Sequence, residues 1–155
     1  MTTELIQHFR EQWKFLRNLT YDFVESIPAS GLEESPGENL SPWWKQFRHL
    51  GRVQENYLAA LDTGIIQFTT ESSSYHGGAD KAGIVEYLHK LDVRLLELLE
   101  LQNPSKTIDW SGTPFTLGKH LLCLADHEIL HHGQWVVYRQ VLGGKFPPSW
   151  SVWGL

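Results

Sequence analysis

The sequence predicts an all-α fold, a four-helix bundle with a long connection between its second and third helices. Four stretches of about twenty residues repeat apolar side chains every three or four positions, which is the period of a helix face against a core. Proline or glycine follows the end of each stretch, and both residues stop helices. From the length of 155 residues we expect one domain, residues 1–155, with a single core.

The first two helices are predicted over residues 3–26 and 41–62. Pro28 closes the first helix. Ser41 and Pro42 open the second with a capping hydroxyl and a proline at the first helical position, and Gly64 ends it. Their apolar stripes contain Leu5, Phe9, Trp13, Leu16 and Phe23 in the first helix, and Trp43, Phe47, Leu50, Tyr57, Leu58 and Leu61 in the second.

Residues 64–80 are the least regular part of the chain and are predicted to form the long connection across the bundle. The third helix, predicted over residues 80–101, has the cleanest repeat, because Ile84 and the leucines after it alternate at spacings of three and four. Asn103 and Pro104 stop this helix. No segment alternates apolar and polar residues strongly enough to predict a strand.

The fourth helix is predicted within residues 115–144. Thr116 can cap its start, and Gly143 and Gly144 end it. The tail after residue 148 is aromatic and nearly uncharged, so we expect it to pack back onto the bundle. The apolar stripe of this helix contains Leu117, Leu121, Leu124, His131, Trp135, Tyr138 and Leu142.

Two histidines of the fourth helix share that apolar stripe. His127 and His131 are four residues apart, so their imidazoles lie on one helix face about one turn apart. Two histidines that point into a helical core need a reason to be there. Metal ligation is the leading reason, because neutral imidazole is a common metal ligand.

The composition excludes several classes of protein. Hydrophobic residues make up 41% of the chain and charged residues 20%, which is typical of a globular domain. The formal net charge of −5 and the lack of a Lys/Arg cluster argue against nucleic-acid binding. We expect no membrane span and no signal peptide, and therefore a soluble, cytoplasmic protein. Cys123 is the single cysteine, so an intrachain disulfide is excluded.

Residues 127–131 read HEILH and match the H-E-x-x-H pattern of zinc proteases, in which the glutamate is a general base. Such a protease takes its third ligand from further along the chain. After Glu128 this sequence contains no Asp or Glu, and beyond His132 it contains no His. The pattern therefore disfavours a protease, and a third ligand has to come from upstream.

The order of motifs resembles the DinB-like superfamily of bacterial metal-binding four-helix bundles. Its mark is a histidine in the second helix and H-x-x-x-H-x-G-Q in the fourth. The matching residues are His49 in FRHLGRVQENYL and the segment from His127 to Gln134. DKAGIVEYL, FTLGKHLL and LGGKFPPSW are also similar to the family, whereas His132 stands where many relatives have an arginine. The resemblance implies that His49, His127 and His131 bind one divalent metal ion, and that the protein is a homodimer.

The family includes S-transferases that use bacillithiol or mycothiol. The resemblance therefore implies a small-molecule substrate and a low-molecular-weight thiol, such as bacillithiol, as a cofactor. Three imidazoles suit zinc, nickel or iron and leave coordination positions open for water or substrate. The expected function is a metal-dependent enzyme, either a thiol-dependent S-transferase or a hydrolase of a small substrate.

Two alternatives stay open at this point. The three histidines can hold a divalent metal without catalysis, which a closed site with four ligands would favour. The chain can also be a metal-free scaffold that binds a partner through its helices and aromatic tail. Hydrogen-bonded histidines without a metal would favour the scaffold, and a deep pocket at the open metal position would favour the enzyme.

Several other residues have candidate roles. Glu128 is the catalytic candidate, because it can orient a ligand or take a proton, but a salt bridge to another helix fits equally well. Cys123 lies four residues before His127 and is expected to be a small buried apolar group rather than a ligand. Candidates for substrate binding, with core packing as the alternative, are Trp43, His120, Gln134 and Tyr138. The residues expected to be ordinary surface or loop histidines are His8, His76, His89 and His132.

Overall fold

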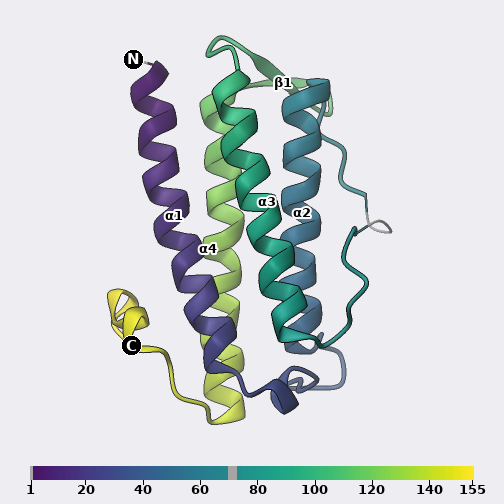
Figure 1. Ribbon diagram of the computed structural model, residues 1–155, viewed down its shortest axis with the longest axis vertical. Helices are drawn as coiled ribbons and strands as arrows, with labels where there is room; N and C mark the ends of the chain where they lie inside the picture. The colour runs from purple at the N-terminus through teal and green to yellow at the C-terminus, as the bar shows by residue number, and fades with distance from the viewer. Residues whose placement is uncertain (1, 70–72) are drawn as a thin grey trace.

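The computed structural model describes residues 2–69 and 73–155, which form four long helices packed lengthwise against one another (Figure 1). This arrangement confirms the predicted all-α bundle. Helix pairs in contact include α1 with α3 and α4, and α2 with α3 and α4. The helices are α1 (Thr2–Ser26), α2 (Trp43–Thr63), α3 (Lys81–Leu101) and α4 (Leu117–Leu142), with two short 3-10 helices, η1 (Ala29–Gly31) and η2 (Pro148–Trp153).

Glycines end α2 and α4 as predicted. Gly64 and Gly143 lie in the left-handed region, with φ angles of 80° and 74°, a conformation that costs little only without a side chain. Their N–H groups donate to carbonyls in the last helical turn. The long connection between α2 and α3 follows Gly64, as predicted.

The starts of α2 and α4 differ in their caps. The Thr116 hydroxyl accepts a hydrogen bond from the N–H of Lys119 at 3.2 Å, which confirms the predicted cap of α4. The prediction for α2 was wrong. This helix begins at Trp43, Pro42 occupies the cap position, and no side-chain hydrogen bond caps that end. The Ser41 hydroxyl therefore lies one residue too early to cap the helix.

A small β-hairpin joins α3 to α4, although no strand was predicted. Strands β1 (Thr107–Trp110) and β2 (Thr113–Thr116) pair antiparallel, with Trp110 opposite Thr113. Ser111 and Gly112 form the two-residue turn and both have positive φ, 53° and 87°, as hairpin turns of this length require. The missed signal was this Ser-Gly pair between segments rich in Thr and aromatic residues.

The C-terminal tail packs back on the bundle, as predicted. Trp150 is completely buried, and its indole N–H donates to the carbonyl of Leu19 at 2.9 Å. Its ring lies 4.6 Å from that of Phe23 and 6.4 Å from that of Trp135, measured between centroids. Burial of three large rings at this end of the bundle contributes several kcal/mol, of the order of 2 for each ring. The tail is thus part of the core between α1 and α4.

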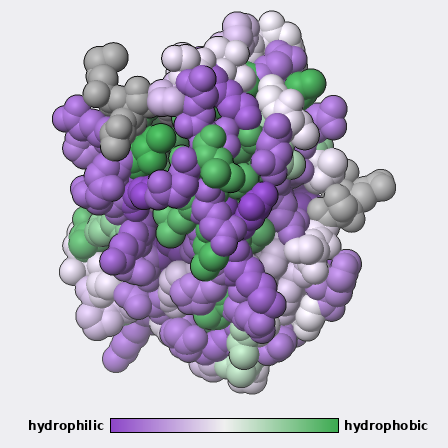
Figure 2. All heavy atoms as spheres, turned by 45° about the horizontal axis from the view of Figure 1, so that its top comes forward, coloured by the Kyte–Doolittle hydropathy of each residue, from purple (hydrophilic) through white to green (hydrophobic). Residues whose placement is uncertain are grey.

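The visible face in Figure 2 is mostly hydrophilic, and its hydrophobic residues form small separate groups. Within the part of the chain that the structure describes, no helix has both the length and the apolar character that a membrane crossing requires.

Inside the bundle, α2 and α3 approach closely at Gly51, where an added Cβ would lie 2.1 Å from the ring of Tyr87. The lack of a side chain at this position allows the ring to pack directly on the α2 backbone.

Candidate metal centre

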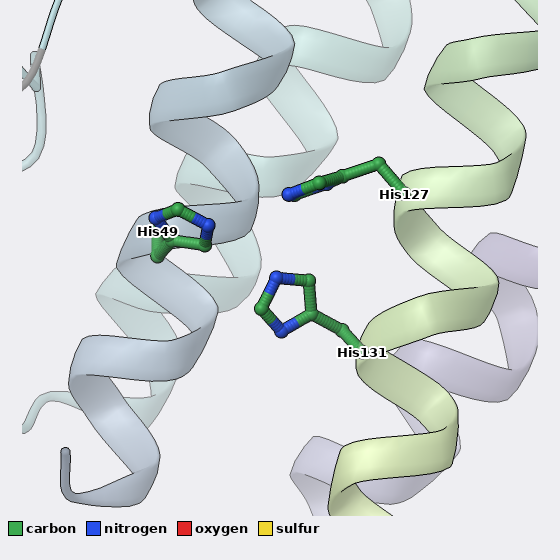
Figure 3. Close-up of side chains that lie close together, drawn as sticks. All are labelled: His49, His127 and His131. Carbon is green, nitrogen blue, oxygen red and sulfur yellow. The ribbon is translucent and has the colours of Figure 1, made fainter. Parts of the chain in front are cut away.

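Three histidines from two helices face one another between α2 and α4 (Figure 3). His49 comes from α2, and His127 and His131 come from consecutive turns of α4. One ring nitrogen from each lies within 4.8 Å of the other two. Ring centroids are 5.3 Å apart for His49 and His127, 5.0 Å for His49 and His131, and 4.6 Å for His127 and His131. The structure therefore brings together the three residues proposed as ligands from the sequence.

Local sequence explains why these rings point inward. On α4 the histidines continue the stripe of buried residues between Leu124 and Trp135, because residues three and four apart share a helix face. On α2, His49 lies next to the buried Leu50, at the border of the face that packs on α4. Packing of these two faces sets the distance between the helices and leaves the imidazoles in the gap.

Burial keeps all three rings neutral at pH 7. Desolvation, and after it the neighbouring histidines, lower the pKa of His127 to about 4 and that of His131 to about 3. The pKa of His49 is also lowered, first by burial and then by the charge of Arg52. A neutral imidazole has a free lone pair for a metal ion. The site therefore needs no proton loss before a cation binds at neutral pH.

The donor set fits a divalent metal with open coordination positions. Nδ1 of His131 is buried and has no hydrogen-bond partner, which is costly for a polar atom unless a ligand satisfies it. Three nitrogen donors are the set found in catalytic zinc sites, where the remaining position is open. Among the described residues, the cluster contains no fourth His, Cys, Asp or Glu. The histidines thus fit a metal site that is not closed by protein ligands.

Arg52 contacts one member of the cluster. Its guanidinium donates to Nδ1 of His49 at 2.9 Å. Because a guanidinium can only donate, Nδ1 is the acceptor and Nε2 carries the proton of the neutral ring. Whichever nitrogen of His49 ligates a metal, this hydrogen bond has to be released. Sequence reasoning missed Arg52, although its position three residues after His49 places both on one helix face.

A cavity of about 670 Å³ opens over the cluster. His49 and His131 form part of its wall, together with Gln134 and Tyr138, two of the predicted substrate-binding candidates. The Tyr138 hydroxyl accepts a hydrogen bond from Nε2 of Gln46 at 3.2 Å. The cavity is large enough for a small organic molecule. Residues of its wall that were not singled out from the sequence include Lys45, Gln46, Arg48 and Arg52.

The other two substrate-binding candidates lie in the core. Trp43 is 1% exposed and packs against Phe23 and Tyr138, with ring centroids 5.3 Å away in both cases. His120 is completely buried and does not belong to the histidine cluster. For both residues the structure favours the alternative considered for them, core packing.

Hydrogen bonds to both ring nitrogens hold His120 in one tautomer. The indole N–H of Trp110 points to Nδ1 at 3.2 Å, and Nε2 lies 3.2 Å from the carbonyl of Tyr57. Because the indole N–H can only donate, Nδ1 accepts, so Nε2 carries the proton and donates to the carbonyl. His120 therefore links α4 to α2 and to the hairpin.

This arrangement predicts a pH-dependent contribution to stability. Burial lowers the pKa of His120 to about 4, whereas an unfolded histidine titrates near about 6.5. The unfolded chain thus binds the proton at higher pH, and the free energy of unfolding falls as the pH is lowered from about 6.5 towards 4. The slope of this free energy against pH is proportional to the number of protons taken up on unfolding, and we expect His120→Gln to reduce that number by up to about one. Urea unfolding at a series of pH values measures it, and an unchanged slope would contradict the assignment.

Glu128 faces away from the histidine cluster. It is 2% exposed and accepts a hydrogen bond from the Thr20 hydroxyl on α1, and its Oε1 lies 3.5 Å from Nη1 of Arg17. Burial raises the pKa of Glu128, and the charge of Arg17 opposes that rise. Of the two roles considered for Glu128, the geometry favours the salt bridge to another helix.

Among the histidines expected at the surface, His132 differs. It is 2% exposed, its Nε2 lies 2.8 Å from the Thr20 hydroxyl, and its ring packs on that of Trp150 at 5.0 Å. The surface prediction for His132 was wrong, because the returning tail covers this face of α4. His8, His76 and His89 are exposed, as predicted. Cys123 is half-buried beside the core and outside the cluster.

A bundle in which two helices present three facing histidines defines the chain as a helical bundle with a candidate metal site. The chain belongs to the DinB superfamily, whose profile matches residues 12–135. A DinB-like protein from Bacillus cereus ATCC 10987 has a similar structure, with a TM-score of 0.74 and 17% identity, over 91% of this chain and 95% of that one. A DinB-like protein from Bacillus subtilis also has a similar structure, with a TM-score of 0.68 and 18% identity, over 94% of this chain and 96% of that one. No curated protein is detectably similar to this chain.

Proposed function

We propose that this protein is a metal-dependent enzyme that transfers a low-molecular-weight thiol, such as bacillithiol, to a small electrophile. One observation carries the proposal: His49 and His131 line a cavity of about 670 Å³ and lie with His127 in a cluster that can hold a cation. A divalent zinc, nickel or iron ion bound there would supply a Lewis acid that lowers the pKa of a coordinated thiol.

The residues around the cluster disfavour hydrolysis that depends on a carboxylate as general base. Hydrolysis at such a site generally uses a carboxylate to take a proton from water, and Glu128 points towards Arg17 instead. No Asp or Glu lines the cavity within the part of the chain that the structure describes. The thiol would give its proton to solvent, and the thiolate sulfur would then bond to the electrophilic carbon as a leaving group such as chloride departs from it, so this step requires no protein general base. Gln134 and Tyr138 would orient the bound molecule through hydrogen bonds from the cavity wall.

The test combines metal analysis with a transfer screen. We expect the purified protein to contain close to one equivalent of a divalent metal and to conjugate an electrophile such as monochlorobimane with bacillithiol. Treatment with a chelator should abolish the transfer, and the metal should restore it. Bound metal without transfer to any electrophile, with any cellular thiol, would favour the non-catalytic alternative. Absence of metal binding would refute both.

Homodimerisation stays a prediction, which the mass of the purified protein in solution would decide. An exposed face of α4 supports it, because this face carries large apolar side chains that a monomer leaves in water. Each of these side chains is more than half exposed, and they are Leu122, Leu130, Val137 and Val141.

A further inference from the structure

Positive charge is concentrated at the cavity over the three histidines, although no Lys/Arg cluster was expected from the sequence. Lys45, Arg48 and Arg52 all line it and follow one another on α2 at spacings of three and four residues, which places them on one helix face. Among the described residues no carboxylate lines the cavity. This contrasts with the whole chain, whose formal net charge is −5. The cavity is therefore a local positive region on an acidic protein.

Two of these cations are positioned by a tryptophan. Nζ of Lys45 lies 5.5 Å and Cζ of Arg48 lies 5.0 Å from the centroid of the Trp44 ring, within the range of cation–π attraction. The indole N–H of Trp44 donates to Glu33 at 3.0 Å, which fixes the ring. The cavity thus has two positioned cations towards the N-terminal end of α2, and Arg52 beside His49.

Like charges on successive turns of one helix repel one another. An anion bound between them would remove this repulsion and would gain charge-assisted hydrogen bonds to the guanidinium and ammonium groups. We infer that the cavity binds a small anionic molecule, with its carboxylate or phosphate group at Lys45 and Arg48 and its reacting end at the histidines. The position of the reacting end rests on the proposed function, but the binding of the anionic group does not.

Matched thiols of different charge test the inference. Mercaptosuccinate carries two carboxylates, 2-mercaptoethanol is neutral, and cysteamine is a cation. We expect the zinc-loaded protein to bind them in that order of decreasing affinity by calorimetry, and added salt to narrow the differences because it screens charges. Equal affinities for the three thiols, or tightest binding of cysteamine, would overturn the inference.

Charge-removing variants locate the anion. The double substitution Lys45→Gln, Arg48→Gln should weaken the binding of mercaptosuccinate about tenfold, the equivalent of about 1.4 kcal/mol. It should leave the affinity for 2-mercaptoethanol unchanged. The matched control, Lys90→Gln, Arg94→Gln, removes two charges from exposed positions on α3 and should change neither affinity. If both double variants lost the same affinity for mercaptosuccinate, the effect would come from the total charge of the protein, and a site at Lys45 and Arg48 would be refuted.

Succinate separates this inference from the proposed function, because it has the carboxylates and lacks the thiol. We expect the chelator-treated protein to bind succinate, and the Lys45, Arg48 double variant to bind it about tenfold more weakly. If succinate binds in this way but no thiol is ever transferred, the anion site stands and the proposed function fails. If transfer occurs with equal affinity for mercaptosuccinate and 2-mercaptoethanol, the proposed function stands and the anion site fails.

Discussion

Replacement of His131 by alanine is expected to remove the stabilisation that a divalent metal would give to the folded protein by binding at the three histidines. A metal at a hundred times its Kd stabilises the fold by about 2.7 kcal/mol. Substitution of residues that only hydrogen-bond to metal ligands weakens metal binding by up to about a hundredfold. Loss of one of the three nitrogen donors themselves should weaken it by at least that factor. The same metal concentration would then contribute about 0.4 kcal/mol or less. Chemical unfolding with and without zinc measures the difference.

The free energy of unfolding is compared with and without zinc for the same variant, so any stability lost through the cavity left by the imidazole cancels. His8→Ala is the matched control, because it removes an exposed imidazole from α1 and should keep the full metal effect. His49→Ala should behave like His131→Ala, because His49 supplies the donor from the other helix. Full metal-dependent stabilisation in either cluster variant would refute the three-histidine site.

Replacement of Arg17 by methionine is expected to cost about 3–5 kcal/mol of stability, the usual effect of leaving a buried charge without its partner. Arg17 is 2% exposed. Its Nε lies 3.2 Å from Asp92 on α3, and its Nη1 lies 3.5 Å from Glu128 on α4. Methionine fills similar space without charge, so two largely buried carboxylates would lose the cation between them. Urea unfolding at pH 7 measures the loss.

The penalty should also depend on pH. Without the guanidinium, which lowers the pKa of Glu128 against the effect of burial, that pKa rises further. Protonation then removes the buried charge, so the stability lost in the variant should be smaller at pH 5 than at pH 8. Arg10→Met is the control, because Arg10 is on the same helix and pairs with the exposed Glu100, and we expect a loss under about 1 kcal/mol. Equal losses for the two variants would contradict the role of Arg17.

The buried network explains a part of the sequence that pattern analysis did not interpret. Arg17 lies between apolar positions of α1, and its ion pairs connect that helix to α3 and α4. Charged side chains are normally exposed, so nothing in the local pattern indicated that this one is buried. Only the positions of Asp92 and Glu128 on neighbouring helices show that it has partners inside the bundle.

The hairpin and the cap of α2 show a related limit. Two strands of four residues each are too short to show a clear alternation of apolar and polar residues. Strand β1 is also held by backbone hydrogen bonds to the segment after α2, because the N–H of Asp109 donates to Gly64 and the N–H of Ile66 donates to Asp109. These bonds connect parts of the chain far apart in sequence. The cap of α2 differs for a more local reason, because the helix begins one residue after the predicted proline.

Properties that depend on neighbouring residues were predictable from the amino-acid sequence: the four helices, most of their ends, and the shared face of His127 and His131. Helix period, capping and glycine termination act within a few residues, so they can be read from short segments. Which side chains from different helices meet could be seen only in the packed bundle. The approach of His49 to the α4 histidines, the burial of His132 under the tail and the turn of Glu128 towards Arg17 depend on how the helices pack, because the distances between helices are set by the whole core.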